Sequence, residues 1–149
     1  MAQRIMVLHG PNLNLLGKRE PHIYGEITLQ SINTRLEAKA EEMDLELEIH
    51  QSNHEGVLVD FIQEASARCA AILINPAALT HYSIALFDAL KAADLPAVEI
   101  HLSNIYCREE FRQKSVVSPA VNGVISGLGS QGYLLGLEAL ASLLKEGTQ

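Results

Sequence analysis

The chain has 149 residues, of which 48% are hydrophobic and 19% charged, a composition that predicts one globular domain and argues against a disordered protein. Its net charge of −7 argues against binding to nucleic acid, because a protein that neutralises phosphates needs a basic face and the sequence shows none. The short apolar start, MAQRIMVLHG, fits neither a signal peptide nor a membrane span, and Cys69 and Cys107 lack metal-ligand spacing, so we expect a cytoplasmic protein without membrane contact.

Apolar runs rich in β-branched residues recur along the chain with helical segments between them. The runs predict strands at residues 4–9, 45–51, 71–75, 97–101 and 123–126. Strand and helix alternate throughout, which predicts an α/β fold of flavodoxin-like type: a doubly wound, five-stranded parallel sheet with helices on both faces. We expect residues 1–149 to form a single catalytic domain.

The spacing of apolar residues places four helices. The first follows a Thr28 N-cap, and the second follows a capping box of Ser52 and Glu55. The third is expected to start near Thr80, to turn Ile84, Phe87 and Leu90 inward, and to end before Pro96. The last is expected from about Gln131, with its apolar stripe given by Tyr133, Leu134, Leu137, Leu140 and Leu144.

Polar residues gather where the predicted strands end. The loop HGPNLNLLGKREPHIYG, residues 9–25, follows the first strand and contains Asn12, Arg19 and Tyr24. Asn75 ends the third strand. Ligands of open α/β sheets bind beyond the carboxyl ends of the strands, so this edge is the expected site. A tyrosine beside an arginine in a water-poor cleft can ionise and become a base.

Glu99 and His101 are two residues apart on the fourth strand and therefore share a face. Buried parallel strands are normally apolar, so the pair needs a partner and a purpose. A carboxylate against one imidazole nitrogen fixes the tautomer and leaves the other nitrogen to transfer a proton. The alternative interpretation is an edge strand with a solvated polar face.

Further candidates flank this edge. Arg108 and Arg112 are four apart, which predicts one face of a short helix, and either could clamp anionic or hydroxyl groups; a solvated helix face is the alternative. His81 is expected at the start of the third helix, facing the same crevice. Asp88 lies seven residues further along and is expected to point away, so any function of Asp88 would serve a neighbouring subunit.

Three other ligand classes are disfavoured. GLGSQG matches the dinucleotide fingerprint formally, but no strand with an acidic residue follows it, so a tight turn is expected there. The first loop lacks the small hydroxyl residues and glycines that would cradle the phosphate of a flavin nucleotide. A phosphoacceptor domain would need carboxylates where this chain has Asn12, Asn14 and Asn75.

Five stretches together resemble one enzyme family, the type II 3-dehydroquinate dehydratases, over the whole chain. They are HGPNLNLLGKREPHIYG, QSNHEG, INPAALTH, VEIHLSNIYCREEFR and GVISGLGSQGYLLGLEAL. The resemblance implies removal of water from 3-dehydroquinate to give 3-dehydroshikimate through an enolate, with no metal and no cofactor. The same step serves shikimate synthesis and quinate breakdown. A non-catalytic scaffold of the same fold would be expected to lack Arg19, Tyr24 or His101, and all three are present.

The resemblance also implies roles for the strand-end residues. Tyr24 is the base, activated by Arg19; His101, oriented by Glu99, is the acid; and Asn12 stabilises the enolate oxygen. The substrate carboxylate is expected to bind Asn75 and the backbone amides of Leu102 and Ser103. The ring hydroxyls are expected to bind His81, Arg112 and a neighbour's Asp88. Such enzymes are commonly dodecamers of four trimers. The chain departs from the family pattern at Ala77, Tyr82 and Phe87, where glycine, a small hydroxyl residue and arginine are usual.

Overall fold

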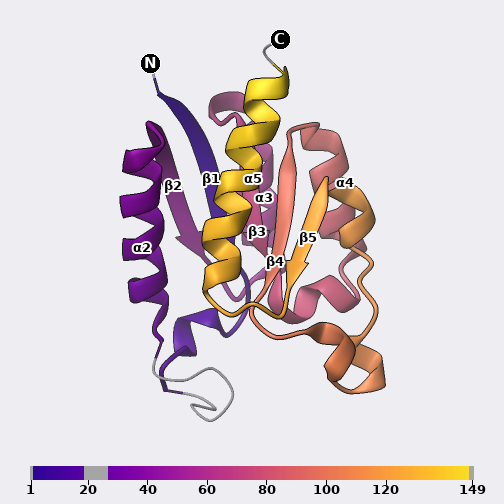
Figure 1. Cartoon of the computed structure of the whole chain (residues 1–149). Coiled ribbons are helices and arrows are strands. Elements are labelled where there is room, and N and C mark those ends of the chain that lie inside the picture. Colours follow the sequence, from indigo (N-terminus) through magenta and orange to yellow (C-terminus); the bar gives the residue numbers. More distant parts are fainter. Residues whose placement is uncertain (1, 19–26, 148–149) are drawn as a thin grey trace.

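Five parallel strands form one sheet in the computed structural model of the chain, which describes residues 2–18 and 27–147 (Figure 1). The strands are β1 (Gln3–His9), β2 (Leu45–Gln51), β3 (Ala71–Asn75), β4 (Ala97–His101) and β5 (Gly123–Ser126). Their order is β2-β1-β3-β4-β5, and every neighbouring pair is parallel. The chain therefore reverses its direction of winding after β2, which confirms the doubly wound, flavodoxin-like fold.

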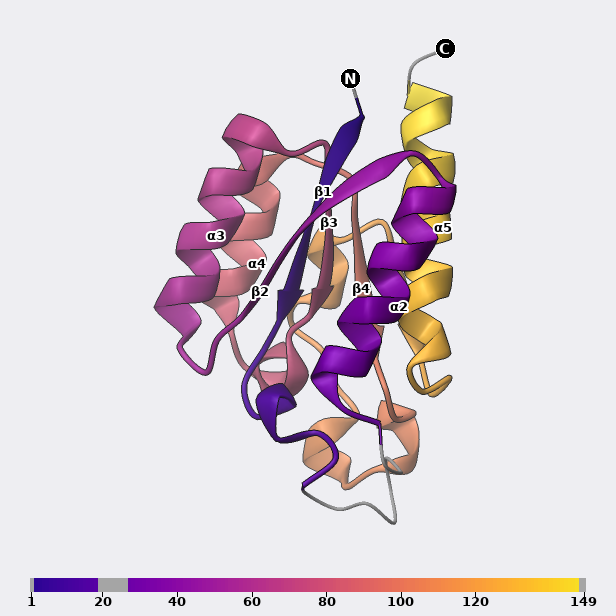
Figure 2. The ribbon, with the colours of Figure 1, turned by 90° about the vertical axis from the view of Figure 1, so that its left-hand side faces the viewer.

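Helices cover both faces of the sheet. Figure 2 shows α2 (Leu29–Glu42) and α5 (Gln131–Gly147) on one side and α3 (Glu55–Arg68) and α4 (Ile84–Ala93) on the other. Side chains of β1 alternate between two cores, with Ile5 and Val7 packed under α2 and α5 and Met6 and Leu8 under α3 and α4. In the described part of the chain, no helix is long and apolar enough to cross a membrane.

Of the two N-terminal helix caps predicted from the sequence for α2 and α3, the structure confirms the first and contradicts the second. Thr28 caps α2 as predicted, since its hydroxyl accepts from the Ser31 N–H at 3.0 Å and the Ser31 hydroxyl accepts from the Thr28 N–H at 3.1 Å. The capping box predicted for Ser52 and Glu55 is wrong. The Ser52 hydroxyl accepts from the His54 N–H at 3.0 Å, and the Glu55 carboxylate accepts instead from the Ser83 hydroxyl on a distant segment.

Helix α4 starts later than predicted. A 3₁₀ turn, η2 (Ala77–His81), occupies the expected first turn, and Ser83 caps α4 by accepting from the Leu86 N–H at 3.0 Å. Helix α4 packs with Leu86, Ala89 and Leu90 buried, whereas Ile84 is 65% exposed. The inward orientation predicted for Ile84 is therefore wrong.

The segments after β4 are irregular. Arg108 and Arg112 do not share one helix as predicted: Arg108 follows the 3₁₀ turn η3 (Ile105–Cys107), and Arg112 ends a second turn, η4 (Glu110–Arg112). The chain continues through η5 (Ser118–Ala120) into β5. The GLGSQG segment forms the expected tight turn before α5, with positive φ at Gly127 and Gly129.

Candidate active site

A cleft of about 160 Å³ lies at the carboxyl edge of the sheet. Its walls come from the loop after β1, from the end of β3 with η2, and from the end of β4 with η3 and η4. The lining residues are Pro11, Asn12, Leu13, Leu15, Leu16, Asn75, Ala77, Ala78, His81, His101, Leu102, Ser103, Ile105, Arg108 and Arg112. The site predicted at the strand ends is thus a concave space lined by both polar and apolar side chains.

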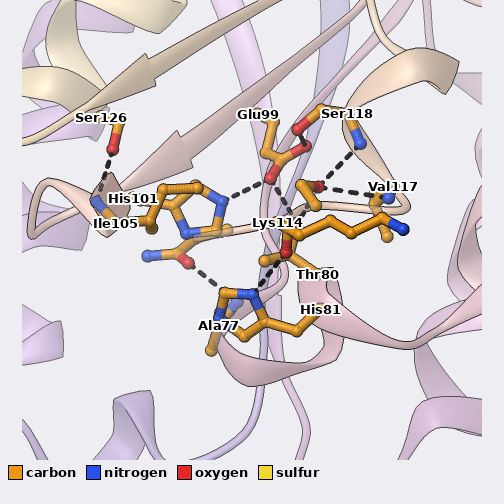
Figure 3. A network of polar contacts seen from close by, with 12 residues as sticks. Ala77, Thr80, His81, Glu99, His101, Ile105, Lys114, Val117, Ser118 and Ser126 are labelled. Carbon is orange, nitrogen blue, oxygen red and sulfur yellow. Dashed lines mark hydrogen bonds and ion pairs between the residues drawn. The ribbon is translucent and has the colours of Figure 1, made fainter. Parts of the chain in front are cut away.

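His101 and Glu99 face each other on the α3/α4 side of β4 (Figure 3). The exposed fraction of the Glu99 residue is 0% and that of His101 is 5%. His101 Nε2–H donates to Glu99 Oε2. Because the carboxylate holds Nε2, Nδ1 is the ring nitrogen left for proton exchange with a ligand in the cleft that His101 lines.

Two hydroxyl groups complete the surroundings of the Glu99 carboxylate. Thr80 Oγ1 donates to Oε2 at 2.6 Å, and Ser118 Oγ donates to Oε1 at 2.9 Å (Figure 3). Burial acts to raise the pKa of Glu99, but the hydrogen bonds from His101, Thr80 and Ser118 outweigh it and hold that pKa below its usual value. Glu99 is therefore ionised and accepts the hydrogen bond from His101 Nε2.

Ser115 fixes the direction of these hydroxyl bonds. Its Oγ accepts from the backbone N–H of Val117 at 3.2 Å and of Ser118 at 2.9 Å. The Thr80 proton is committed to Glu99, so the 2.6 Å contact between Ser115 Oγ and Thr80 Oγ1 is a bond that Ser115 donates. Ser115 therefore donates to Thr80, and Thr80 donates to the Glu99 carboxylate.

Asn75 and Asn12 occupy the opposite side of the cleft. Asn75 is 2% exposed; its Oδ1 accepts from the Ala77 N–H at 3.0 Å and its Nδ2 donates to the Tyr133 hydroxyl at 3.0 Å. Asn12 has a left-handed backbone with φ 71°, and its N–H donates to Asn53 Oδ1 at 2.9 Å. The Asn12 turn bends the chain so that residues on both sides of it line the cleft.

Basic side chains border the same space. His81 Nδ1–H donates to the Lys114 carbonyl at 2.7 Å (Figure 3), which leaves Nε2 as an acceptor for a ligand hydroxyl. Arg108 donates from Nη1 to Ser103 Oγ at 3.2 Å, and Arg112 Nε lies 2.7 Å from Glu109 Oε2. Both arginines line the cleft, and Arg112 is also paired with the exposed neighbour Glu109, as the alternative interpretation of a solvated face expects.

The segment that follows His101 is anchored from β5. Ser126 Oγ donates to the Ser103 carbonyl at 3.1 Å and accepts from the Ile105 N–H at 3.2 Å. The Gly129 N–H donates to the Leu102 carbonyl at 3.0 Å. These bonds hold the backbone of residues 102–105 against the cleft, which Leu102, Ser103 and Ile105 line.

Comparison with known proteins gives a match for nearly the whole chain. The family model described as dehydroquinase class II matches residues 3–141. The chain belongs to this family. Among curated relatives, a 3-dehydroquinate dehydratase of Halothermothrix orenii is 52% identical over 97% of this chain and 98% of its own length. One of Acaryochloris marina is 58% identical over 97% of each chain. The crystal structure of type II dehydroquinase from Butyrivibrio crossotus superposes with a TM-score of 0.91 at 42% identity, covering 93% of this chain and 97% of that one.

Most of the site residues predicted from the sequence lie in one place. Asn12, Asn75, His81, His101, Leu102, Ser103, Arg108 and Arg112 line the cleft, with Glu99 directly behind His101. Asp88 lies exposed on α4 and is not among the described residues that line the cleft. Its expected relation to His81 on one helix is wrong, because His81 belongs to η2. Arg19 and Tyr24 lie outside the described residues.

The sequence patterns do not mark the groups that hold the residues of this cleft in place. Ser115 and Ser118 lie in an irregular segment with no periodicity to mark them, and Thr80 was assigned to a helix start. Tyr133 fits the apolar stripe of α5, which concealed its hydroxyl contact with Asn75. Ser118 lies between Val117 and Pro119, so its local sequence gives no signal that identifies a partner.

Proposed function

We propose that this chain catalyses the dehydration of 3-dehydroquinate to 3-dehydroshikimate through an enolate, with Tyr24 as base and His101 as acid. The single observation that carries the proposal is the buried His101–Glu99 pair that opens onto the cleft. Such a pair supplies a proton donor next to a space of substrate size, and the family resemblance supplies the reaction.

The proposed reaction moves two protons. The tyrosinate of Tyr24, stabilised by Arg19, removes a proton from the carbon next to the ketone, and the electron pair forms the enolate. The enolate then collapses, a carbon–carbon double bond forms, and the carbon–oxygen bond breaks. His101 donates its proton to the departing hydroxyl, which leaves as water. Asn12 stabilises the enolate oxygen, since a fixed dipole at a developing charge lowers the barrier.

Substrate binding is assigned to the remaining lining residues. We assign the carboxylate to Asn75 and the backbone amides of Leu102 and Ser103, and the ring hydroxyls to His81 and Arg112, with Arg108 bracing Ser103. Neutral donors suit an acidic protein with an acidic substrate, because they attract an anion without a net positive surface. We assign Asp88 to the site of a neighbouring subunit.

The proposal includes a homo-oligomer, with a dodecamer of four trimers as its expected size. Large apolar side chains are exposed on the segments that flank the cleft, with exposed fractions of 66% at Tyr82, 65% at Ile84 and 69% at Phe111. Exposed apolar groups of this kind favour a protein contact.

The direct test is turnover of 3-dehydroquinate by the purified chain, followed by the ultraviolet absorbance of the conjugated product. Turnover is expected with no added metal or nucleotide and with a chelator present. Tyr24→Phe is expected to retain substrate binding and to lose most of kcat, because only proton abstraction loses its group. Absence of turnover by the unmodified chain contradicts the proposed activity, and near-normal turnover by Tyr24→Phe contradicts the assignment of the base.

A further inference from the structure

Four polar side chains from four different elements form a continuous hydrogen-bonded relay under the α2/α5 face of the sheet. His9 Nε2 lies 2.8 Å from Asn33 Oδ1, and His9 Nδ1 lies 2.9 Å from the Tyr133 hydroxyl. The Tyr133 hydroxyl also accepts from Asn75 Nδ2 at 3.0 Å. His9 and Tyr133 have no exposed surface, and Asn75 alone among the four lines the cleft.

One backbone group sets the polarity of the whole relay. The Ala77 N–H can only donate, so the Asn75 atom that faces it is Oδ1, and Nδ2 faces Tyr133. The Tyr133 oxygen accepts that bond and gives its own proton to His9 Nδ1. His9 must then carry its proton on Nε2 and donate it to Asn33. Burial lowers the pKa of His9 to about 4, which keeps the ring neutral and Nδ1 free to accept.

We propose that Tyr133, supported by His9 and Asn33, is a positioning residue that fixes the Asn75 amide so that its second N–H is presented to the substrate carboxylate. This inference rests on the proposed function. An amide rotated by half a turn would present a carbonyl oxygen to the carboxylate and repel it. The Ala77 N–H opposes that rotation, because the rotated amide would set the Asn75 nitrogen against it. The relay opposes it as well, because with the His9 proton on Nε2 Tyr133 would have to donate in two directions.

The burial of these groups argues for a purpose beyond packing. An apolar side chain of similar shape at residue 133 would fill the core without any hydroxyl to satisfy. Burying the imidazole, the phenol and the amide together is tolerated only when every donor and acceptor is paired, and here each pairing leads toward the one member that borders the cleft. The arrangement therefore fixes the orientation of the Asn75 side-chain amide.

The test replaces the Tyr133 hydroxyl alone. Tyr133→Phe is expected to raise KM for 3-dehydroquinate by about 3- to 10-fold, the worth of one net hydrogen bond, with kcat changed by less than about twofold. Tyr106→Phe is the matched control, because Tyr106 is 69% exposed and belongs to no part of the relay; its KM is expected to stay unchanged. A purely structural role would lower the fraction of folded enzyme, and hence the apparent kcat, with KM unchanged, and this result would overturn the proposal.

Two further variants locate the effect. Tyr133→Phe combined with Asn75→Ala is expected to have the KM of Asn75→Ala alone, because Tyr133 acts only through Asn75; additive losses would contradict the relay. Asn33→Ala removes the acceptor that fixes the His9 tautomer at the far end and is expected to raise KM by a smaller factor. Turnover by the unmodified chain is measured first, so that failure of the proposed activity is seen separately from failure of the relay.

Discussion

His101 contributes most to holding the pKa of Glu99 below its usual value, and two neutral hydroxyl groups, of Thr80 and Ser118, add to that effect. We expect Thr80→Val to lower kcat by about tenfold or more, since a hydrogen bond to a charged group contributes roughly 1.5–3 kcal/mol. Loss of the Thr80 donor raises the pKa of Glu99, so Glu99 is protonated at a higher pH. The acid limb of the pH–rate profile then moves toward higher pH. Thr34→Val on α2 is the matched control, because the Thr34 hydroxyl donates only to the Gln30 carbonyl at an exposed position. Identical profiles for the two variants would contradict this role of Thr80.

Ala77 combines a cleft position with an unfavourable backbone. Its φ of 52° is left-handed, which an alanine adopts at a cost of about 1–2 kcal/mol. Ala77→Gly is therefore expected to raise the free energy of unfolding by roughly 0.5–1 kcal/mol, after subtraction of the extra entropy that glycine gives the unfolded chain. The neighbouring Ala78→Gly relieves no such strain and should lower it by about 0.5–1 kcal/mol. Urea denaturation of both variants measures the difference, and equal destabilisation would contradict strain at Ala77.

At the scale of elements, α5 approaches the sheet through a glycine. A Cβ added at Gly136 would lie 2.7 Å from Leu73 Cδ1 and 2.8 Å from Ile100 Cδ1. We expect Gly136→Ala to lower the free energy of unfolding by about 1–3 kcal/mol, the usual cost of overpacking a core. Gly56→Ala on α3 meets no atom within 4 Å and should be neutral or slightly stabilising, because alanine favours helix. Thermal unfolding of the pair distinguishes close packing from helix propensity, and similar effects would refute the packing argument.

The elements also show where sequence patterns fail. Thr28 precedes an apolar stripe of helical spacing, which predicts an N-cap, and its partner in the structure, Ser31, lies only three residues away. Glu55 was assigned to a capping box, but its carboxylate bonds to Ser83, 28 residues further along the chain. The spacing of Ile84, Phe87 and Leu90 predicts an inward Ile84, but in the structure Ile84 is the exposed first residue of α4 and Leu86 is buried. Periodicity is reliable inside an element and fails where a tertiary contact decides the boundary.

At the scale of the whole molecule, the exposed position of Asp88 outside the cleft permits a test of assembly. Asp88→Asn and His101→Ala are each expected to be inactive as separate proteins. Mixed oligomers formed by coexpression are expected to recover part of the activity, because a site with intact His101 from one subunit then meets intact Asp88 from another. Unmixed variants combined after purification, without subunit exchange, are the control. No recovery in verified mixed oligomers would contradict the assignment of Asp88 to a neighbour.

The sequence by itself determined the positions of the five strands and the fold class. It also determined that Asn12, Asn75, Glu99 and His101 lie at one edge of the sheet, because parallel strands place their carboxyl ends together. Only the tertiary structure decided what holds each of those groups. Tyr133 meets His9 across 124 positions of sequence, and Ser118 meets Glu99 across 19. Such contacts leave no periodic trace in either segment, since their hydrogen bonds depend on how the elements pack and not on local spacing.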